Sequence, residues 1–136
     1  MDKTLILDIV TPERSLLTEE IQSLVVPATE GYMGILPNHA PIISGLKPGV
    51  IRYRQDGKKN FLSLSGGFME ISHNKITILA DAAEKPEEID EKRALAAKQR
   101  AQQRLKERPA GVDVARAEMA LMRAIARLRV KNYLEK

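Results

Sequence analysis

The chain contains 136 residues, of which 43% are hydrophobic, 29% are charged and none is cysteine. The lack of cysteine excludes disulfide bridges, cysteine-bound zinc and a thiol nucleophile. No apolar run approaches the roughly 20 residues that cross a bilayer, and Met1-Asp2-Lys3 does not begin a secretory signal. We therefore expect one small, soluble, cytosolic unit.

Charge and composition both change near residue 80. Residues 1–80 carry 8 acidic and 8 basic side chains, whereas residues 81–136 carry 10 acidic and 14 basic ones, so the net charge of +4 lies in the second part. Seven of the 8 glycines lie in the first part and 12 of the 15 alanines in the second. This division predicts an α+β fold, with a turn-rich β domain over residues 1–84 and a helical domain over residues 85–136.

Short apolar runs separated by turn residues predict β-strands in the first part. We expect strands over residues 3–10, 21–26, 49–54, 60–65, 68–72 and 75–80. In the first of these, Leu5, Leu7 and Ile9 share one face. Asp56-Gly57 and Ser72-His73-Asn74 suit tight turns between neighbouring strands. Many short strands with polar turns are typical of an antiparallel β-sandwich or barrel, and we predict a sandwich.

Residues 27–49 are the least strand-like piece, because they contain four of the 7 prolines. We predict irregular backbone here. Gly31 and Gly34 allow close approach of the backbone, and Pro37 and Pro41 stiffen the exit, so the segment can present a fixed surface at one end of the sandwich. A well-packed corner without a binding role is the alternative interpretation.

The second part is predicted to form two antiparallel helices. Pro86 and the acidic residues that follow it suit a helix N-terminus, and this helix should run to about Arg108. Pro109-Ala110-Gly111 interrupts it, and Asp113 can cap a second helix that continues towards Tyr133. A connection this short makes the two helices neighbours.

The two predicted helices repeat each other at an offset of 23 residues, with seven of thirteen aligned positions identical. At about 100° per residue, each helix carries a row of arginines beside a stripe of small residues. The rows are Arg93, Arg100 and Arg104 in one helix and Arg116, Arg123 and Arg127 in the other. If the stripes face each other, both rows lie on one side of the hairpin, where a phosphate would match the guanidinium groups. A solvated basic face is the alternative.

Residues typical of catalysis are absent from the pattern. His39 and His73 are isolated, so no metal site is expected, and Gly66-Gly67 lies between strand-like runs without the lysine and helix of a phosphate loop. A bend or bulge is the expected role of this glycine pair. No serine lies in a nucleophile-elbow context. We expect a protein that is not an enzyme.

Three segments, Glu30–Pro41, Leu64–Ile71 and Ile89–Ala94, resemble the epsilon subunit of bacterial F-type ATP synthases and occur in the same order. The similarity covers nearly the whole chain. It implies a β-sandwich of about ten strands in the family, followed by a helical hairpin. It also implies a non-catalytic rotor component that binds the gamma subunit and the c-ring, at the cytoplasmic side of the cell membrane and attached only through the complex.

The same resemblance implies sites. The c-ring would be contacted by Glu30, Gly31, Tyr32 and His39. The hairpin would fold against the sandwich or extend to the alpha and beta subunits, where it blocks ATP hydrolysis, and its basic side chains suit acidic surface there. No cofactor is obligatory, and ATP is a regulatory ligand of some family members. The matching ATP-binding positions are Ile89, Asp90, Arg93, Ala94, Arg100, Arg123 and Arg127.

Two other hypotheses compete with this assignment. A nucleic-acid-binding module would use the basic hairpin, but aromatic residues make up only 4% of the chain and none lies in the arginine rows. Bases therefore have no stacking platform, and we expect no nucleic acid partner. A coiled-coil adaptor would self-associate through Ala117, Leu121, Ala124 and Leu128.

Overall fold

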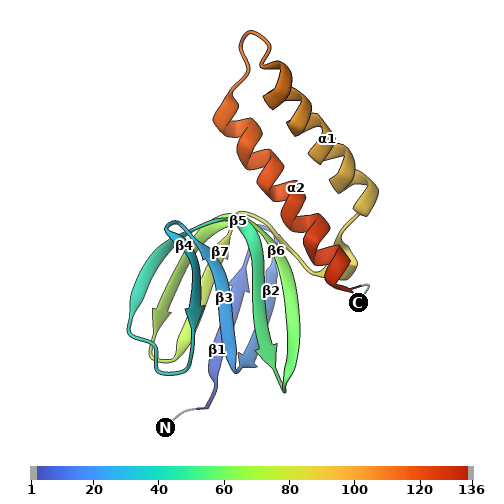
Figure 1. Cartoon of the computed structure of the whole chain (residues 1–136). Helices are drawn as coiled ribbons and strands as arrows, with labels where there is room; N and C mark the ends of the chain where they lie inside the picture. The colour runs from blue at the N-terminus through green and yellow to red at the C-terminus, as the bar shows by residue number, and fades with distance from the viewer. Residues whose placement is uncertain (1–2, 135–136) are drawn as a thin grey trace.

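A computed structural model describes residues 3–134 and contains eight strands, one short 3-10 helix (η1) and two α-helices (Figure 1). The predicted order of a β-sandwich followed by two packed helices is confirmed. The elements are β1 (Leu5–Val10), β2 (Ser15–Ile21), β3 (Ser23–Ala28), β4 (Gly31–Ile35), β5 (Ile42–Gln55), β6 (Lys58–Ser72), β7 (Lys75–Ala80), β8 (Ala83–Glu84), η1 (Pro86–Glu88), α1 (Glu91–Glu107) and α2 (Val114–Leu134).

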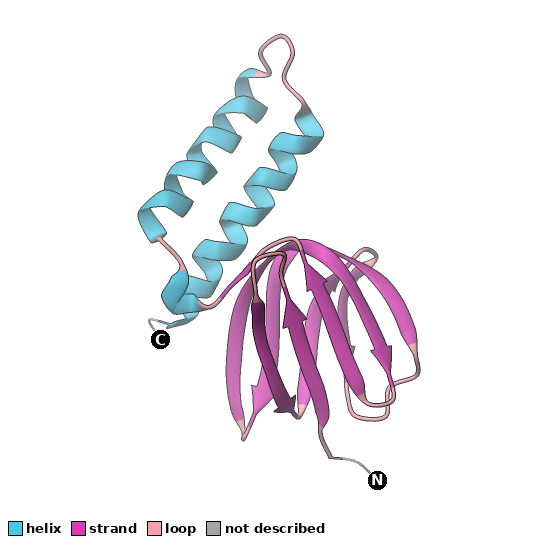
Figure 2. Cartoon of the chain, turned by 180° about the vertical axis from the view of Figure 1, so that it is seen from behind, coloured by secondary structure: helices cyan, strands magenta, loops and turns pink. Residues whose placement is uncertain are grey.

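The strands are hydrogen-bonded in the order β2-β1-β7-β6-β5-β3-β4, and β8 pairs with β6. The long strands β5 and β6 curve, so the strands form two layers that enclose the core (Figure 2). Every pairing is antiparallel except that of β1 with β7, which is parallel. The expectation of a wholly antiparallel sandwich is therefore wrong at this pair, because alternation within a strand carries no information about its partner's direction.

The glycine pair Gly66-Gly67 bends β6, which joins two strands that the sequence predicts separately. Both residues have positive φ angles, 112° and 146°. A Cβ built on Gly67 would lie 2.2 Å from the carbonyl oxygen of Leu79 on the neighbouring strand. Only glycine fits this close approach, so the expected bend is confirmed while the strand continues through it.

Residues 27–49 contain far more regular structure than the prolines suggest. β3 ends in this segment, β4 lies within it and β5 begins in it, so the prediction of irregular backbone is wrong except at residues 29–30 and 36–41. Pro27 and Pro48 lie where the register between β3 and β5 shifts, between the pairs Val25–Arg52 and Ala28–Leu46. Proline is tolerated there because a strand irregularity already removes ladder hydrogen bonds.

The interior of the sandwich is filled by aliphatic side chains from all its long strands. Leu5, Leu7 and Ile9 point inward and are almost completely buried, which confirms the alternation predicted for β1. Two-residue turns connect β5 to β6 at Asp56-Gly57 and β6 to β7 at His73-Asn74, with positive φ at all four positions. Both turns agree with the sequence prediction.

The helical hairpin is capped at both helix starts by aspartate. Asp90 Oδ1 accepts a hydrogen bond from Arg93 N, and Asp113 Oδ1 accepts one from Arg116 N, each at 3.1 Å. α1 begins later than predicted, because Pro86–Glu88 forms η1 instead of the first turn. The alanine stripes face each other as expected, and their buried members are Ala94 and Ala101 in α1 and Ala117 and Ala124 in α2.

The hairpin packs on one end of the sandwich through the C-terminal half of α2, while α1 lies on the outer side of α2 (Figure 1). The segment that runs from the end of β8 to the start of α1, residues 84–90, is called the linker. Val50 of β5, Ile89 of the linker, and Ala126 and Val130 of α2 form a second buried cluster, against which Phe61 packs. Lys131 Nζ also donates a hydrogen bond to the carbonyl oxygen of Pro86, at 3.3 Å. We call this arrangement the docked hairpin.

Candidate functional site

A polar pocket lies where the linker enters the hairpin, with a volume of about 360 Å³. Its walls come from the linker, from the first turns of α1 and from α2, so it exists only while the hairpin is closed and docked. We call it the arginine pocket, and it is lined by Glu84, Glu88, Asp90, Arg93, Ala94, Ala97, Arg100 and Arg127.

Three guanidinium groups converge on the arginine pocket. Arg93 and Arg100 lie on the same face of α1 because two helical turns separate them, and Arg127 reaches the pocket from α2. Arg127 Nε donates to Glu84 Oε1 at 2.5 Å, whereas Arg93 and Arg100 have no ion-pair partner within residues 3–134. The pocket can therefore accept an anionic group with little competition from acidic side chains at two of its three arginines.

Asp90, Ala94 and Ile89 have structural roles in the same region. The Asp90 carboxylate caps α1, and the Ala94 N–H donates to the Asp90 carbonyl oxygen at 3.0 Å, so this N–H already has an acceptor. Ala94 itself is buried and supplies a small wall of the pocket. Ile89 does not line the pocket, because its side chain is buried in the cluster with Val50 and Val130.

Among the arginines predicted to bind ATP, Arg123 is the one that does not line the pocket. It lies one helical turn before Arg127, towards the tip of the hairpin, and is half-buried. The structure thus brings Arg93, Arg100 and Arg127 together with Asp90 and Ala94, and leaves Arg123 and Ile89 outside the lining.

Glu84 and Glu88 line the pocket and are missing from the sequence prediction. Glu88 Oε1 accepts from Lys85 N at 2.8 Å, and Glu88 Oε2 pairs with the guanidinium of Arg14 from the β1–β2 turn. Partial burial alone would raise the pKa of Glu88, but the Lys85 N–H and the Arg14 guanidinium outweigh burial and lower it. The Lys85 N–H is local to Glu88, but Arg14, which pairs with Glu88, and Arg127, which pairs with Glu84, lie far away in the sequence, so no local signal places either carboxylate at the pocket.

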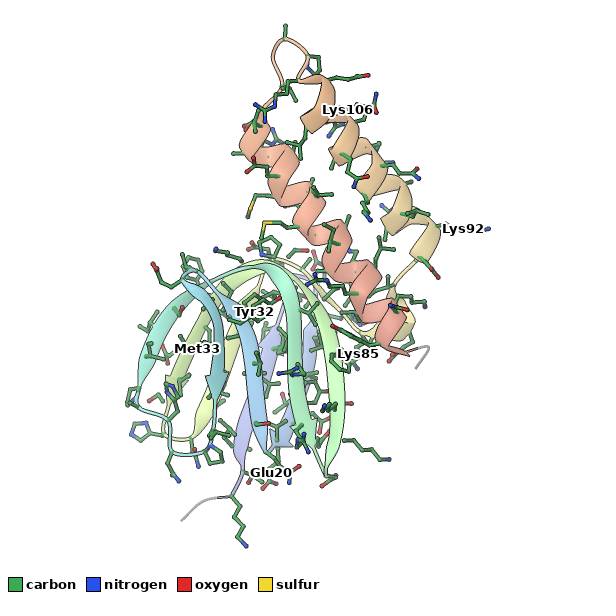
Figure 3. All side chains as sticks on the ribbon, viewed as in Figure 1. Glu20, Tyr32, Met33, Lys85, Lys92 and Lys106 are labelled. Atoms are coloured by element: carbon green, nitrogen blue, oxygen red, sulfur yellow. The ribbon has the colours of Figure 1, made fainter. Side chains whose placement is uncertain are left out.

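The predicted c-ring residues do not lie together. Glu30 lies in the turn between β3 and β4 at the hairpin end of the sandwich, and Gly31 and Tyr32, the latter labelled in Figure 3, begin β4 there. The Tyr32 hydroxyl accepts a hydrogen bond from Val50 N at 3.2 Å. His39 lies in the loop that follows β4, at the opposite end, where its Nδ1 donates to the Ala40 carbonyl oxygen at 2.8 Å. β4 therefore separates His39 from the other three residues.

An apolar patch covers part of the outer surface of the sandwich. Ile43, Phe68 and Leu79 are 74%, 64% and 57% exposed, and Phe68 lies directly beside Leu79 in the β6–β7 register. Gly45 pairs with Phe68 on the other side, so the three side chains face outward from adjacent strands. Exposed apolar surface of this kind marks an interaction site more often than a free face, and we call it the apolar sheet face.

Other kinds of site can be stated only for the described part of the chain. Among residues 3–134, no helix is both long enough and apolar enough to span a membrane, and no group of three or more His, Cys, Asp or Glu side chains is arranged to hold a metal ion.

A β-sandwich with an exposed apolar face and a docked basic hairpin has the surfaces expected of a binding or regulatory subunit. The model of the ATP synthase delta/epsilon chain β-sandwich domain matches residues 4–86, and that of the delta/epsilon chain long α-helix domain matches residues 87–132. The chain belongs to this family, as an epsilon chain of the bacterial type. It is a non-catalytic subunit of the central stalk.

Relatives of similar sequence support this assignment, and a solved structure shares the fold. The chain is 55% identical to the ATP synthase epsilon chain of Desulfitobacterium hafniense, covering 94% of this chain and 96% of the relative. It is 51% identical to that of Symbiobacterium thermophilum, covering 95% and 94%. A chain of the Euglena gracilis mitochondrial ATP synthase has the same fold, with a TM-score of 0.81 at 23% identity, covering 100% of this chain and 84% of that one.

Proposed function

We propose that the hairpin controls ATP hydrolysis by exchanging between the docked state and an extended state, and that ATP bound in the arginine pocket favours the docked state. In the extended state the basic helices would contact the alpha and beta subunits. The observation that carries this proposal is that one pocket is walled by the linker, α1 and α2 together. A ligand that touches all three walls binds the docked state preferentially and so shifts the equilibrium towards it.

The chemistry of the pocket suits a nucleotide triphosphate. Arg93 and Arg100 would hold the phosphates, and Arg127 would join them by exchanging Glu84 for a phosphate oxygen. Guanidinium groups bind phosphate in forked pairs, and partial burial strengthens such contacts. Asp90 and the small side chain of Ala94 would then orient the nucleoside beside the start of α1. Ile89 and Arg123 would contribute without lining the pocket. Ile89 would fix the position of the linker, and Arg123 would contact the part of the nucleotide that extends out of the pocket.

The small extent of the docking interface supports a switch. The hairpin contacts the sandwich mainly through α2, and α2 contributes two side chains to the buried cluster, Ala126 and Val130, of which Ala126 buries little area. A ligand at ten times its dissociation constant favours the docked state by about 1.4 kcal/mol. If the two states are nearly equal in free energy, this difference raises the ratio of docked to extended hairpins by about tenfold.

We further propose that the apolar sheet face binds the gamma subunit. Three exposed apolar side chains on adjacent strands have the composition of an interface centre. The c-ring would be contacted along the edge strand β4, because this strand connects Glu30, Gly31 and Tyr32 at one end to His39 at the other. The subunit would be held at the cytoplasmic side of the membrane only through these partners.

Calorimetric titration of ATP into the full chain, with and without magnesium, tests the nucleotide site. We expect binding that Arg93→Gln and Arg100→Gln each weaken by at least about tenfold, because each removes a charge-assisted contact. Arg116→Gln is the matched control, since Arg116 belongs to the same repeat but lies outside the pocket. An ATP affinity that is unchanged in all three variants would contradict the proposed site. Absence of binding at millimolar ATP would show that the hairpin is controlled by something other than ATP.

A further inference from the structure

A second pocket lies between the hairpin and the end of the sandwich, away from the arginine pocket. One wall is α2, with Met122, Ile125 and Ala126, and the other is formed by the ends of β3 and β4 and by β5, including Tyr32 of β4 and Pro48 of β5. Its volume is about 290 Å³. We call it the Tyr32 pocket. Like the arginine pocket, it joins two parts of the molecule that meet only in the docked state.

The walls of the Tyr32 pocket are mainly apolar. Tyr32 and Met122, which both line the pocket, remain 58% and 37% exposed. Gly49 forms part of the floor, and a Cβ there would lie 2.8 Å from the Tyr32 hydroxyl oxygen, so the ring of Tyr32 can lie close over β5. Covering these side chains with an apolar ligand would release water from both walls at once.

The rim of the pocket is cationic. Lys47 and Arg129 are its only charged lining residues, and neither forms an ion pair within the described part of the chain. An apolar pocket with two cations at its rim complements an amphiphile with one anionic group. A neutral ligand would leave the cations unused, and a cationic one would be repelled.

We propose that the Tyr32 pocket binds a small alkyl carboxylate, with the chain against Tyr32 and Met122 and the carboxylate beside Lys47 and Arg129. The volume, at the lower limit for ligand pockets, selects a short chain such as that of octanoate. Because the ligand contacts α2 and the sandwich together, it stabilises the docked hairpin. Binding itself depends only on the docked arrangement, whereas its effect on ATP hydrolysis rests on the proposed function.

The five methionines provide a direct test by NMR of isotope-labelled methionine methyl groups in the full chain. Octanoate should shift the Met122 methyl resonance in a saturable manner and leave that of Met69 unchanged, because Met69 is 1% exposed in the sandwich core. At ten times the dissociation constant, the ratio of docked to undocked hairpins should rise about elevenfold. 1-Octanol and octylamine should bind more weakly, in that order.

Arg129→Gln should weaken octanoate binding by up to about fivefold, as expected for a partly exposed ion pair. Arg116→Gln, on the same helix but outside the pocket, should leave it unchanged. Equal binding of octanoate and octylamine, or no saturable shift of Met122, would overturn the inference. Since Arg129 does not line the arginine pocket, ATP binding should persist in Arg129→Gln, which separates failure of this inference from failure of the nucleotide site.

Discussion

Tyr133, in the last turns of α2, stacks on Phe61 of β6, with ring centroids 4.2 Å apart and an angle of 28° between the ring planes. This aromatic pair joins the C-terminal end of the hairpin to the sandwich. It lies beside the buried cluster of Val50, Ile89, Ala126 and Val130, so it closes the docking interface at the edge. The docked hairpin thus depends on a few contacts near one end of one helix.

Replacing Tyr133 by alanine should therefore undock the hairpin without unfolding the sandwich. An offset aromatic pair contributes about 0.5–1.5 kcal/mol beyond its buried area, which lowers the ratio of docked to undocked hairpins about twofold to tenfold. The methyl resonances of Val130, which is fully buried when docked, report this change. Met119→Ala is the control, because Met119 is exposed on the same helix. An equal decrease in the docked fraction in both variants would show that the stack of Tyr133 on Phe61 makes no specific contribution to docking.

The ion pair between Arg14 and Glu88 should make the linker sensitive to acid. The folded pKa of Glu88 is lowered, so its stabilising contribution is present above the ordinary carboxyl pKa and is lost as the pH falls through the lowered value. Arg14→Gln should raise the pKa of Glu88 towards the ordinary value, as measured by NMR titration of the carboxyl group. Glu118 serves as a reference carboxyl on α2, and a Glu88 pKa that does not change in Arg14→Gln would contradict the cause assigned here.

Gly67→Ala should destabilise the sandwich by about 3 kcal/mol, because the residue has a positive φ and the new methyl group meets the Leu79 carbonyl oxygen. Gly57→Ala is the matched comparison, since Gly57 also has a positive φ but its Cβ would meet nothing within 4 Å. That variant should cost about 1 kcal/mol. Urea unfolding of the full chain measures the free energy of unfolding of both variants. Equal losses of stability would show that the neighbouring strand moves away from the new methyl group at position 67 without a further energetic cost.

If the apolar sheet face binds the gamma subunit, Phe68→Glu should weaken that binding by at least tenfold, or about 1.4 kcal/mol. The stability of the isolated chain should change little, because Phe68 is 64% exposed. Leu95→Glu, on the outer side of α1, introduces the same charge at another exposed apolar position. Titration against purified gamma subunit compares them, and unchanged affinity in Phe68→Glu would assign the gamma contact elsewhere.

Local interactions explain the parts of the fold that were predicted correctly. The alternation of Leu5, Leu7 and Ile9, the turn at Asp56-Gly57 and the cap at Asp113 involve residues within a few positions of each other. The strand at Gly31–Ile35 is absent from the sequence prediction because the prolines around it indicate irregular backbone. In the fold, Pro37 and Pro41 lie in the loop that follows this strand, and the shift in pairing between β3 and β5 accommodates Pro27 and Pro48.

The candidate site, too, could be predicted only in part, because local patterns do not determine contacts between distant segments. The helical repeat places arginines in rows, but it does not determine which of them reaches the linker. In the folded chain Arg127 pairs with Glu84, whereas Arg123, one turn away, lies outside the pocket. Glu84 and Glu88 could not be assigned from pattern, because their partners Arg127 and Arg14 lie far away in the sequence.

The amino-acid sequence by itself determined the α+β class, the order of sandwich and hairpin, the Asp113 cap of α2 and the facing alanine stripes. These follow from periodicity, turn chemistry and capping, which act over a few residues. The tertiary structure alone decided the parallel pairing of β1 with β7, the separation of Gly31 from His39 and the docking of α2 on β5 and β6. Each of these depends on which distant segments bury their apolar faces together, and that choice is made by the packed core as a whole.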